Sequence, residues 1–312
     1  MRKFDPYLQE VLRSAYDAIA ESLAVTVMRA AYSEIVRESL DFSTALCDRH
    51  GLTLAQGVCT PMHLGSFHDA IQNLIATVSA DASEGDVFIF NDPFLAAGQH
   101  LPDIYVVKPI FHDGLIEGWA TTLAHHSDVG GIVPGSNALG AEEVFQEGLR
   151  LPILPLLRKG VRVAEVWAVI EANVRTPDLV RGDLEAQIAA CNSGEREFKD
   201  LIARYGIETI RESAEELHRY TERLTRAEFA ALADGTYTFI DHLDGLGEHP
   251  TPIRLEVAVT VSGDEITVDW SGSDPQVPGG INSTLPFTKA CSYAAIRSIM
   301  TQDIPNCHGF TV

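Results

Sequence analysis

The sequence predicts an α+β fold in which antiparallel β-hairpins combine with long amphipathic helices and are followed by a second antiparallel sheet. An Asp-Gly turn at residues 113–114 separates two apolar runs, which is a typical hairpin signal. Apolar residues recur at helical spacing over residues 5–37 and 163–232. After residue 234, segments of alternating polarity are separated by tight turns, which indicates antiparallel strands. We therefore expect an α+β domain over residues 1–234 and a β-rich domain over residues 235–312, incomplete at its C-terminal end.

The first element is a predicted amphipathic helix over residues 5–37. Asp5 is suited to cap its N-terminus, and Pro6 occupies the first helical position. Residues 38–48 then change to strand character, and a His-Gly turn at residues 50–51 starts a hairpin. Glu38 and Asp41 lie where the helix gives way to the strand.

The next segment begins with a loop at residues 61–66, followed by a helix over residues 67–80. A buried strand is expected at residues 85–90, ended by the turn signal Asn91-Asp92-Pro93. His63 and His68 lie at the loop and at the start of the helix. A histidine in such a place is more often a local hydrogen-bonding residue, so we give both low weight as candidate ligands.

The two strands of the central hairpin are expected at residues 104–111 and 115–124. With the turn centred near Asp113, cross-strand partners have numbers that sum to about 227, within a residue or two, because the turn sets the register. Asp103 then lies opposite about Ala124. The polar side chains that flank the strands should therefore converge at the open end of the hairpin; they are His100, Asp103, His125, His126 and Asp128.

Imidazole and carboxylate groups gathered in one place are the donors that a divalent cation such as Zn²⁺, Mn²⁺ or Fe²⁺ selects, with open positions for water or substrate. His125 is preferred to His126 because successive strand residues point to opposite faces, so only one shares the side of Asp103. Glu38 or Asp41 would add a carboxylate to the set, although either can be a solvated cap. The alternative for the histidines is that they are solvated or hydrogen-bonded turn residues.

The segment after the histidines is a glycine-rich loop without a recognisable nucleotide-binding motif. It is followed by a helical turn at residues 141–147 and an extended segment at 151–155. The long helical region is expected to break near Thr176-Pro177 and Tyr205-Gly206. Arg175 and Arg181 could bind an anionic ligand, although solvated arginine is the simpler interpretation. The remaining predicted elements are strands at residues 236–243, 253–261 and 265–270 and a helix at 286–300.

Composition limits the classes of partner. The chain has 312 residues, with 23 Lys and Arg against 44 Asp and Glu and a formal charge of -21, so its surface would repel a phosphate backbone and nucleic acid is excluded as an expected partner. Five cysteines without a CxxC pair indicate reduced thiols in a cytoplasmic protein. No signal peptide and no apolar run of about 20 residues is present in the sequence, so we expect no membrane span.

Eight segments together resemble the hydantoinase B/5-oxoprolinase family. They are ESLDFSTALCD (38–48), FNDPF (90–94), HLPDI (100–104), HHSDVGG (125–131), EGLRLP (147–152), NVRTPDLVRGDLEAQIAA (173–190), DGTYTFIDHLD (234–244) and DWSGSDPQVPGGIN (269–282). The resemblance extends over nearly the whole chain in order. Members of the family are longer, so this chain is expected to correspond to the N-terminal part of the subunit.

The resemblance implies a catalytic subunit of an ATP-dependent hydrolase that opens cyclic amides such as hydantoins, lactams or 5-oxoproline. Its partner in a hetero-oligomer would be an actin-like ATPase subunit of the hydantoinase A type, which uses ATP to phosphorylate the substrate. Carried over by motif, the metal ligands would be His100, Asp103 and His125, with Glu38 or Asp41 as the remaining carboxylate. Water activated by the metal would attack the ring carbon, and Asp128 or His126 is the candidate base or orienting residue.

Two alternatives stay open. A subunit of an ATP-dependent ketone carboxylase would use the same metal as a Lewis acid for an enolate or a carboxyl group. A non-catalytic scaffold would use the acidic surface and the amphipathic helices to dock other subunits. Incorporation of labelled bicarbonate distinguishes the first alternative, and elemental analysis for metal distinguishes the second.

Overall fold

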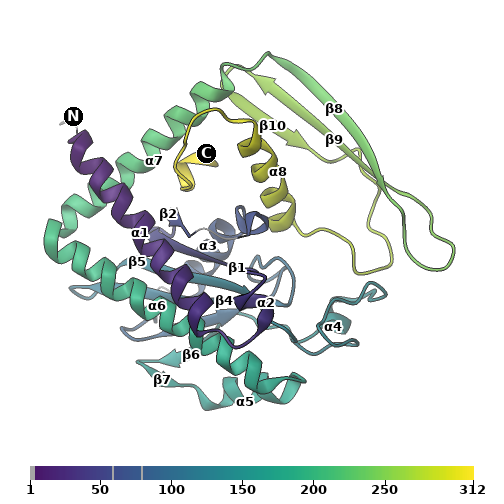
Figure 1. Ribbon diagram of the computed structural model, residues 1–312, viewed down its shortest axis with the longest axis horizontal. Coiled ribbons are helices and arrows are strands. Elements are labelled where there is room, and N and C mark those ends of the chain that lie inside the picture. Colours follow the sequence, from purple (N-terminus) through teal and green to yellow (C-terminus); the bar gives the residue numbers. More distant parts are fainter. Residues whose placement is uncertain (1–3, 58–59, 79) are drawn as a thin grey trace.

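The computed structural model of the protein describes residues 4–57, 60–78 and 80–312 (Figure 1). Its helices are α1 (Pro6–Ala30), α2 (Glu34–Arg37), α3 (Phe67–Val78), α4 (Val144–Glu147), α5 (Ala164–Asn173), α6 (Pro177–Tyr205), α7 (Ile207–Phe229) and α8 (Leu285–Ile299), with short 3-10 helices η1 (Pro61–His63) and η2 (His308–Phe310). Its strands are β1 (Phe42–Asp48), β2 (Thr53–Gln56), β3 (Val87–Phe90), β4 (Asp103–His112), β5 (Leu115–His125), β6 (Leu154–Arg158), β7 (Val161–Arg162), β8 (Gly235–Leu243), β9 (Ile253–Ser262) and β10 (Glu265–Asp269). The predicted α+β class is confirmed.

A seven-stranded antiparallel sheet of order β2-β1-β5-β4-β3-β6-β7 forms the centre of the molecule. Helices α1 and α6 pack on one face of this sheet, and α3 packs on the other (Figure 1). Strand β3 and the first eight residues of β4 are consequently buried along their whole length. Burial on both faces explains why these segments are nearly continuous apolar runs rather than alternating ones.

The predicted helix over residues 5–37 is two helices, α1 and α2. Asp5 caps α1 as expected, since its Oδ1 accepts a hydrogen bond from the Tyr7 backbone N–H at 2.9 Å. The chain then leaves the helical path because Asp183 on α6 accepts from the backbone N–H groups of Tyr32 and Ser33, at 2.7 and 3.0 Å. Ser33 in turn caps α2 through the Val36 N–H. Side-chain oxygens thus accept hydrogen bonds from backbone N–H groups at the break, in place of the backbone carbonyls that would accept them in an uninterrupted helix.

The central hairpin pairs in nearly the predicted register. Partner numbers sum to 227 next to the turn, at Phe111 and His112, and to 228 from Ile110 back to Asp103. A bulge between Ile110 and Phe111 causes the change, since an extra residue in one strand shifts the pairing beyond it by one position. Asp103 therefore lies opposite His125 rather than Ala124, and directly paired residues share a face of the sheet.

Two further elements differ from the expectations. The segment expected only to be extended near residue 155 forms a hairpin, β6–β7, whose turn contains Lys159 and Gly160 at positive φ. Asp86 fixes this turn by accepting from the Lys159 backbone N–H and from Arg158. The expected loop at residues 61–66 contains the 3-10 helix η1. The predicted breaks between α5, α6 and α7 are confirmed.

The second sheet has the order β10-β9-β8, and α7 leads to it from the large sheet (Figure 1). Arg226 on α7 contacts Glu265 on β10 at 3.5 Å. Strands β8 to β10 and helix α8 lie within two residues of the predicted bounds, so the antiparallel second sheet is confirmed. The domain boundary near residue 234 stays a prediction. Within the described part of the chain, no helix has both the length and the apolar character needed to cross a lipid bilayer.

Candidate metal centre

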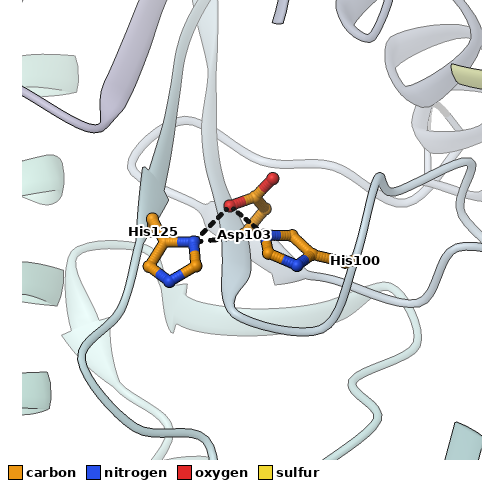
Figure 2. Close-up of side chains that lie close together, drawn as sticks. All are labelled: His100, Asp103 and His125. Atoms are coloured by element: carbon orange, nitrogen blue, oxygen red, sulfur yellow. Dashed lines mark hydrogen bonds and ion pairs between the residues drawn. The ribbon is translucent and has the colours of Figure 1, made fainter. Parts of the chain in front are cut away.

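Three side chains meet at the open end of the β4–β5 hairpin (Figure 2). Asp103 is the first residue of β4 and His125 the last of β5, so their pairing places both on the same face of the sheet. His100 precedes β4 by one tight turn, which is closed by a hydrogen bond from the Asp103 N–H to the His100 carbonyl at 3.0 Å. This turn folds the His100 ring back toward the carboxylate.

The donor atoms of this cluster are close together. Asp103 Oδ1 lies 2.9 Å from His100 Nε2 and 3.2 Å from His125 Nδ1, and the two ring nitrogens are 3.1 Å apart. Ligand atoms around a tetrahedral cation, at about 2.0–2.1 Å from it, are separated by roughly 3.3 Å, so these spacings fit one ion after small movements. Asp103 and His125 are buried, whereas 39% of the His100 side chain is exposed. The cluster is therefore open to solvent on the His100 side.

Electrostatics keep Asp103 ionised. Burial alone would raise its pKa, but the charge and hydrogen bond of His100, with further hydrogen bonds from His125 and His63, hold the pKa well below its usual range. Burial would lower the pKa of His100, and the Asp103 carboxylate outweighs that effect and raises it. A buried carboxylate that attracts positive charge this strongly is suited to a cation.

The two carboxylates considered as a further ligand have different surroundings. Asp41 Oδ2 lies 3.8 Å from His125 Nδ1, and the Asp41 carbonyl accepts a hydrogen bond from the His125 N–H at 2.9 Å. Glu38 follows α2, is exposed, and contacts Arg37 at 3.3 Å. Asp41 is thus the carboxylate beside the cluster.

His126 and Asp128, which the sequence placed in the same group, have other partners. His126 points to the opposite face of the sheet, where its Nε2 lies 3.0 Å from Gln187 Oε1 on α6, and burial lowers its pKa. The Asp128 carboxylate accepts hydrogen bonds from the backbone N–H and from Nη1 of Arg175. His126 lies on the opposite face because successive residues of a strand point to opposite faces of the sheet. Asp128 lies outside the cluster because it pairs with Arg175.

The arginines considered for anion binding are engaged by the protein itself. Besides Asp128, the Arg175 guanidinium donates to the carbonyls of Gly130, Gly131 and Val133, so it fixes the glycine-rich loop. Arg181 forms ion pairs with Glu171 and Asp178 on the surface.

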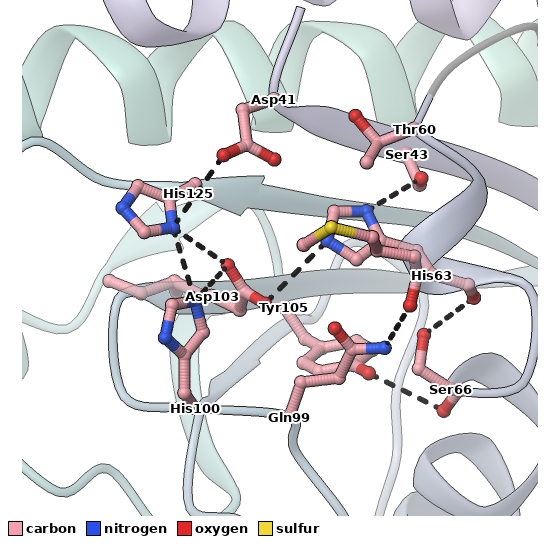
Figure 3. A network of polar contacts seen from close by, with 12 residues as sticks. Asp41, Ser43, Thr60, His63, Ser66, Gln99, His100, Asp103, Tyr105 and His125 are labelled. Carbon is pink, nitrogen blue, oxygen red and sulfur yellow. Dashed lines mark hydrogen bonds and ion pairs between the residues drawn. The ribbon is translucent and has the colours of Figure 1, made fainter. Parts of the chain in front are cut away.

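His63 lies next to the cluster, although its place in the sequence did not favour it as a ligand. It is buried, with its Nε2 3.6 Å from Asp103 Oδ2 and its Nδ1 2.8 Å from Ser43 Oγ on β1 (Figure 3). Its position 37 residues before His100 contains no periodic signal. Only the fold brings η1 beside the start of β4.

A cavity of about 320 Å³ adjoins the cluster. His100 and Asp103 form part of its wall, and residues 136–147 and 276–287 supply most of the rest. Glu147 lines it on the side of His100, and burial raises the pKa of this carboxyl. The volume lies at the lower end of the range for small-molecule sites, which suits a ligand of one small ring.

Comparison with known proteins gives a consistent family. A family model described as hydantoinase B/oxoprolinase matches residues 5–312. The putative D-/L-hydantoinase subunit of the B type from Pseudomonas sp. (strain NS671) is 34% identical over 311 residues, covering 96% of this chain and 52% of that protein. The crystal structure of the ATP-dependent caprolactamase from Pseudomonas jessenii has a TM-score of 0.91 and 30% identity, covering 98% of this chain and 53% of that chain. The nucleotide-free structure of acetone carboxylase, with a TM-score of 0.90 and 21% identity over 98% of this chain and 42% of that chain, shares the fold alone.

Proposed function

This chain belongs to the hydantoinase B/oxoprolinase family, and from that premise we propose that it carries the metal centre of a subunit that acts in ATP-dependent hydrolysis of a cyclic amide. The supporting observation is the convergence of His100, Asp103 and His125, because two of these residues, His100 and Asp103, also line a cavity of suitable size. The chain spans about half the length of the hydantoinase relative.

The ligands in this proposal are His100, Asp103, His125 and Asp41. A mixed set of imidazole nitrogens and carboxylate oxygens suits Zn²⁺, Mn²⁺ or Fe²⁺. When bound, such a cation would supply Lewis acidity to a carbonyl group and lower the pKa of a water molecule. The protein's own contribution is to hold the donor atoms in fixed positions, with only the His100 side of the cluster exposed. A ring that enters the cavity would therefore approach the metal centre from the His100 side.

His126 and Asp128 act indirectly in this proposal. His126 anchors the end of β5 to α6 through Gln187, next to the ligand His125. Asp128 and Arg175 fix the start of the glycine-rich loop that continues to the cavity wall at Ser136. Both residues would therefore orient the site without touching the substrate.

ATP would be used by a second protein chain. The sequence contains no recognisable nucleotide motif, whereas the matching caprolactamase is described as ATP-dependent and the hydantoinase relative as one subunit of its enzyme. We infer a hetero-oligomer in which an actin-like ATPase of the hydantoinase A type phosphorylates the amide. Phosphorylation of the amide oxygen makes the ring carbon more electrophilic, which is needed because unactivated cyclic amides hydrolyse slowly. Water would then add to this carbon, the C–N bond would break as the nitrogen takes a proton, and hydrolysis of the resulting acyl phosphate would release phosphate.

The direct test uses the full-length protein purified with its ATPase partner. Hydantoin, caprolactam and 5-oxoproline are supplied with and without ATP, and ring opening is measured. The proposal predicts ATP-dependent opening of a cyclic amide by the wild type, a loss of more than about 100-fold in Asp103→Asn, and unchanged activity in His112→Gln at the far end of β4. A complex that binds metal but opens no cyclic amide, or that fixes labelled bicarbonate onto a ketone, would contradict it. Purified protein that contains less than about a tenth of an equivalent of metal per chain would favour the scaffold alternative.

A further inference from the structure

The two oxygens of the Asp103 carboxylate face different partners. Oδ1 faces the rings of His100 and His125, at 2.9 and 3.2 Å. Oδ2 points the other way and lies 3.6 Å from His63 Nε2. Among the described residues, the donors that lie within 4.8 Å of one another belong to His100, Asp103 and His125, so His63 is outside this group. His63 therefore contacts the carboxylate from the side opposite to the cluster.

The His63 ring is itself held firmly. Ser43 on β1 lies behind the ring, with Oγ 2.8 Å from Nδ1, and both side chains are buried. The Ser66 hydroxyl donates to the His63 carbonyl at 2.8 Å, and the Gln99 side chain donates to the carbonyl of Met62 at 2.5 Å (Figure 3). Gln99 precedes His100 in the chain. These contacts join η1 to both β1 and the turn that carries a cluster residue.

We propose that His63 is a positioning residue for Asp103: held by Ser43, it retains the outer carboxylate oxygen so that Oδ1 stays directed at the point shared with His100 and His125. This inference rests on the proposed function, because it concerns a carboxylate that binds a cation. A ligand carboxylate without an outer partner is free to rotate about its Cβ–Cγ bond. Metal binding must then fix the orientation of the carboxylate, and this loss of conformational freedom lowers the affinity for the metal.

The chemistry of the contact suggests a graded set of variants. Leucine at position 63 fills similar space but has no polar atom. Glutamine places an amide N–H donor near the position of the histidine Nε2, so it preserves the contact with Asp103. His112, in the same hairpin but at its turn end, is half-exposed and gives a matched control for the histidine-to-glutamine change.

Affinity for Mn²⁺ is measured in the full-length protein purified with its partner, by titration with detection of free Mn²⁺ by electron paramagnetic resonance. We expect His63→Leu to raise the dissociation constant by about 10–100-fold. His63→Gln should recover most of this loss, and His112→Gln should bind as the wild type does. Ser43→Ala should weaken binding in the same direction as His63→Leu but by less. The melting temperature of each metal-free variant is measured alongside the titration. A variant that fails to fold would have a lowered melting temperature, and its loss of Mn²⁺ binding would not follow the order expected for leucine, glutamine and histidine at position 63.

Two results would overturn the inference. If His63→Leu binds Mn²⁺ as tightly as the wild type, His63 does not position the ligand, while the proposed metal centre stands. If both His63 variants lose the metal equally and the spectrum of the Co²⁺-substituted protein shows one nitrogen donor fewer, His63 is itself a ligand. A wild type that binds no metal would overturn the metal centre along with the inference, so the two failures are distinguishable.

Discussion

Asp41 and Glu38 are three residues apart in the sequence, yet their carboxylates have different partners. The sequence left the choice between them open because both lie at the end of the first helical region. The structure places Asp41 beside His125, where it precedes β1 and its backbone continues the β1–β5 pairing. Helix α2 ends with Glu38 directed at Arg37 instead. Strand pairing, which spacing alone does not reveal, decides between the two carboxylates.

Substitution of the two carboxylates should give unequal effects. Asp41→Asn removes a charge next to the cluster and is expected to weaken Mn²⁺ binding by at least about tenfold. Glu38→Gln removes a surface charge and should change the affinity by less than about threefold. Isothermal titration of both variants with Mn²⁺ measures the difference. Equal losses in the two variants would exclude Asp41 as a specific ligand.

His218, a partly buried histidine on α7 outside the cluster, should make stability depend on pH. Its Nε2 lies 3.3 Å from Asp48 Oδ2. Burial lowers the pKa, but the contacts with Asp48 and Cys307 outweigh burial and raise the pKa to about 9. Because this value is above the ordinary histidine pKa, the stabilisation is fully present below about pH 6.5 and is lost as the pH rises through about 9.

The pH effect is measured as the difference in the free energy of unfolding between the wild type and His218→Gln. This difference should fall by about 3 kcal/mol between roughly pH 6 and pH 10. Denaturant unfolding at several pH values gives the curve, and other titrating groups cancel in the comparison. Parallel curves for the two proteins would show that His218 is not charged in the folded protein.

At the scale of elements, the sequence predicted the hairpin but not the bulge within it. The Asp113-Gly114 turn fixes the pairing of the residues next to it, and there the predicted sum of 227 holds. The bulge at Ile110–Phe111 shifts the pairing of all residues from Ile110 back to Asp103 by one position. As a result, Asp103 lies opposite His125 rather than Ala124. Bulges depend on packing against neighbouring strands and helices, so a local pattern does not contain them. The sequence thus predicted that His100, Asp103 and His125 would meet, but it grouped His126 and Asp128 with them, and it gave the register only to within a residue or two.

The break between α1 and α2 depends on an element far along the chain. Asp183 is buried on α6 and reaches the backbone of Tyr32 and Ser33. Gly182 allows this close approach, because a Cβ at that position would overlap the Tyr32 ring. Local helical periodicity continues through the break, which is why the sequence predicted one helix.

Loss of the Asp183 carboxylate should destabilise this junction. Asp183→Ala leaves two backbone N–H groups without their acceptor and is expected to lower the free energy of unfolding by about 2–3 kcal/mol. Asp200→Ala, an exposed position on the same helix, should change it by less than about 0.5 kcal/mol. Urea denaturation compares the two. A similar small effect in both would mean that Asp183 does not hold the junction.

At the scale of the whole molecule, the sequence predicted the class and the order of nearly all elements. Hydrophobic periodicity and turn residues are local signals, and they located α6, α7 and the second sheet within a few residues. The order of strands in the large sheet was not predictable in this way, because β3 pairs with β6 across more than 60 residues of chain. For the same reason His63 was overlooked, since only the assembled sheet and η1 place it behind Asp103.

The central claim is that His100, Asp103 and His125 surround one divalent cation. X-ray diffraction from crystals of the Mn²⁺-loaded full-length protein, collected on both sides of the manganese absorption edge, tests it most directly. The account predicts an anomalous peak among His100 Nε2, Asp103 Oδ1 and His125 Nδ1, at about 2.0–2.2 Å from each. A stoichiometric peak elsewhere, with none at these three residues, would contradict it.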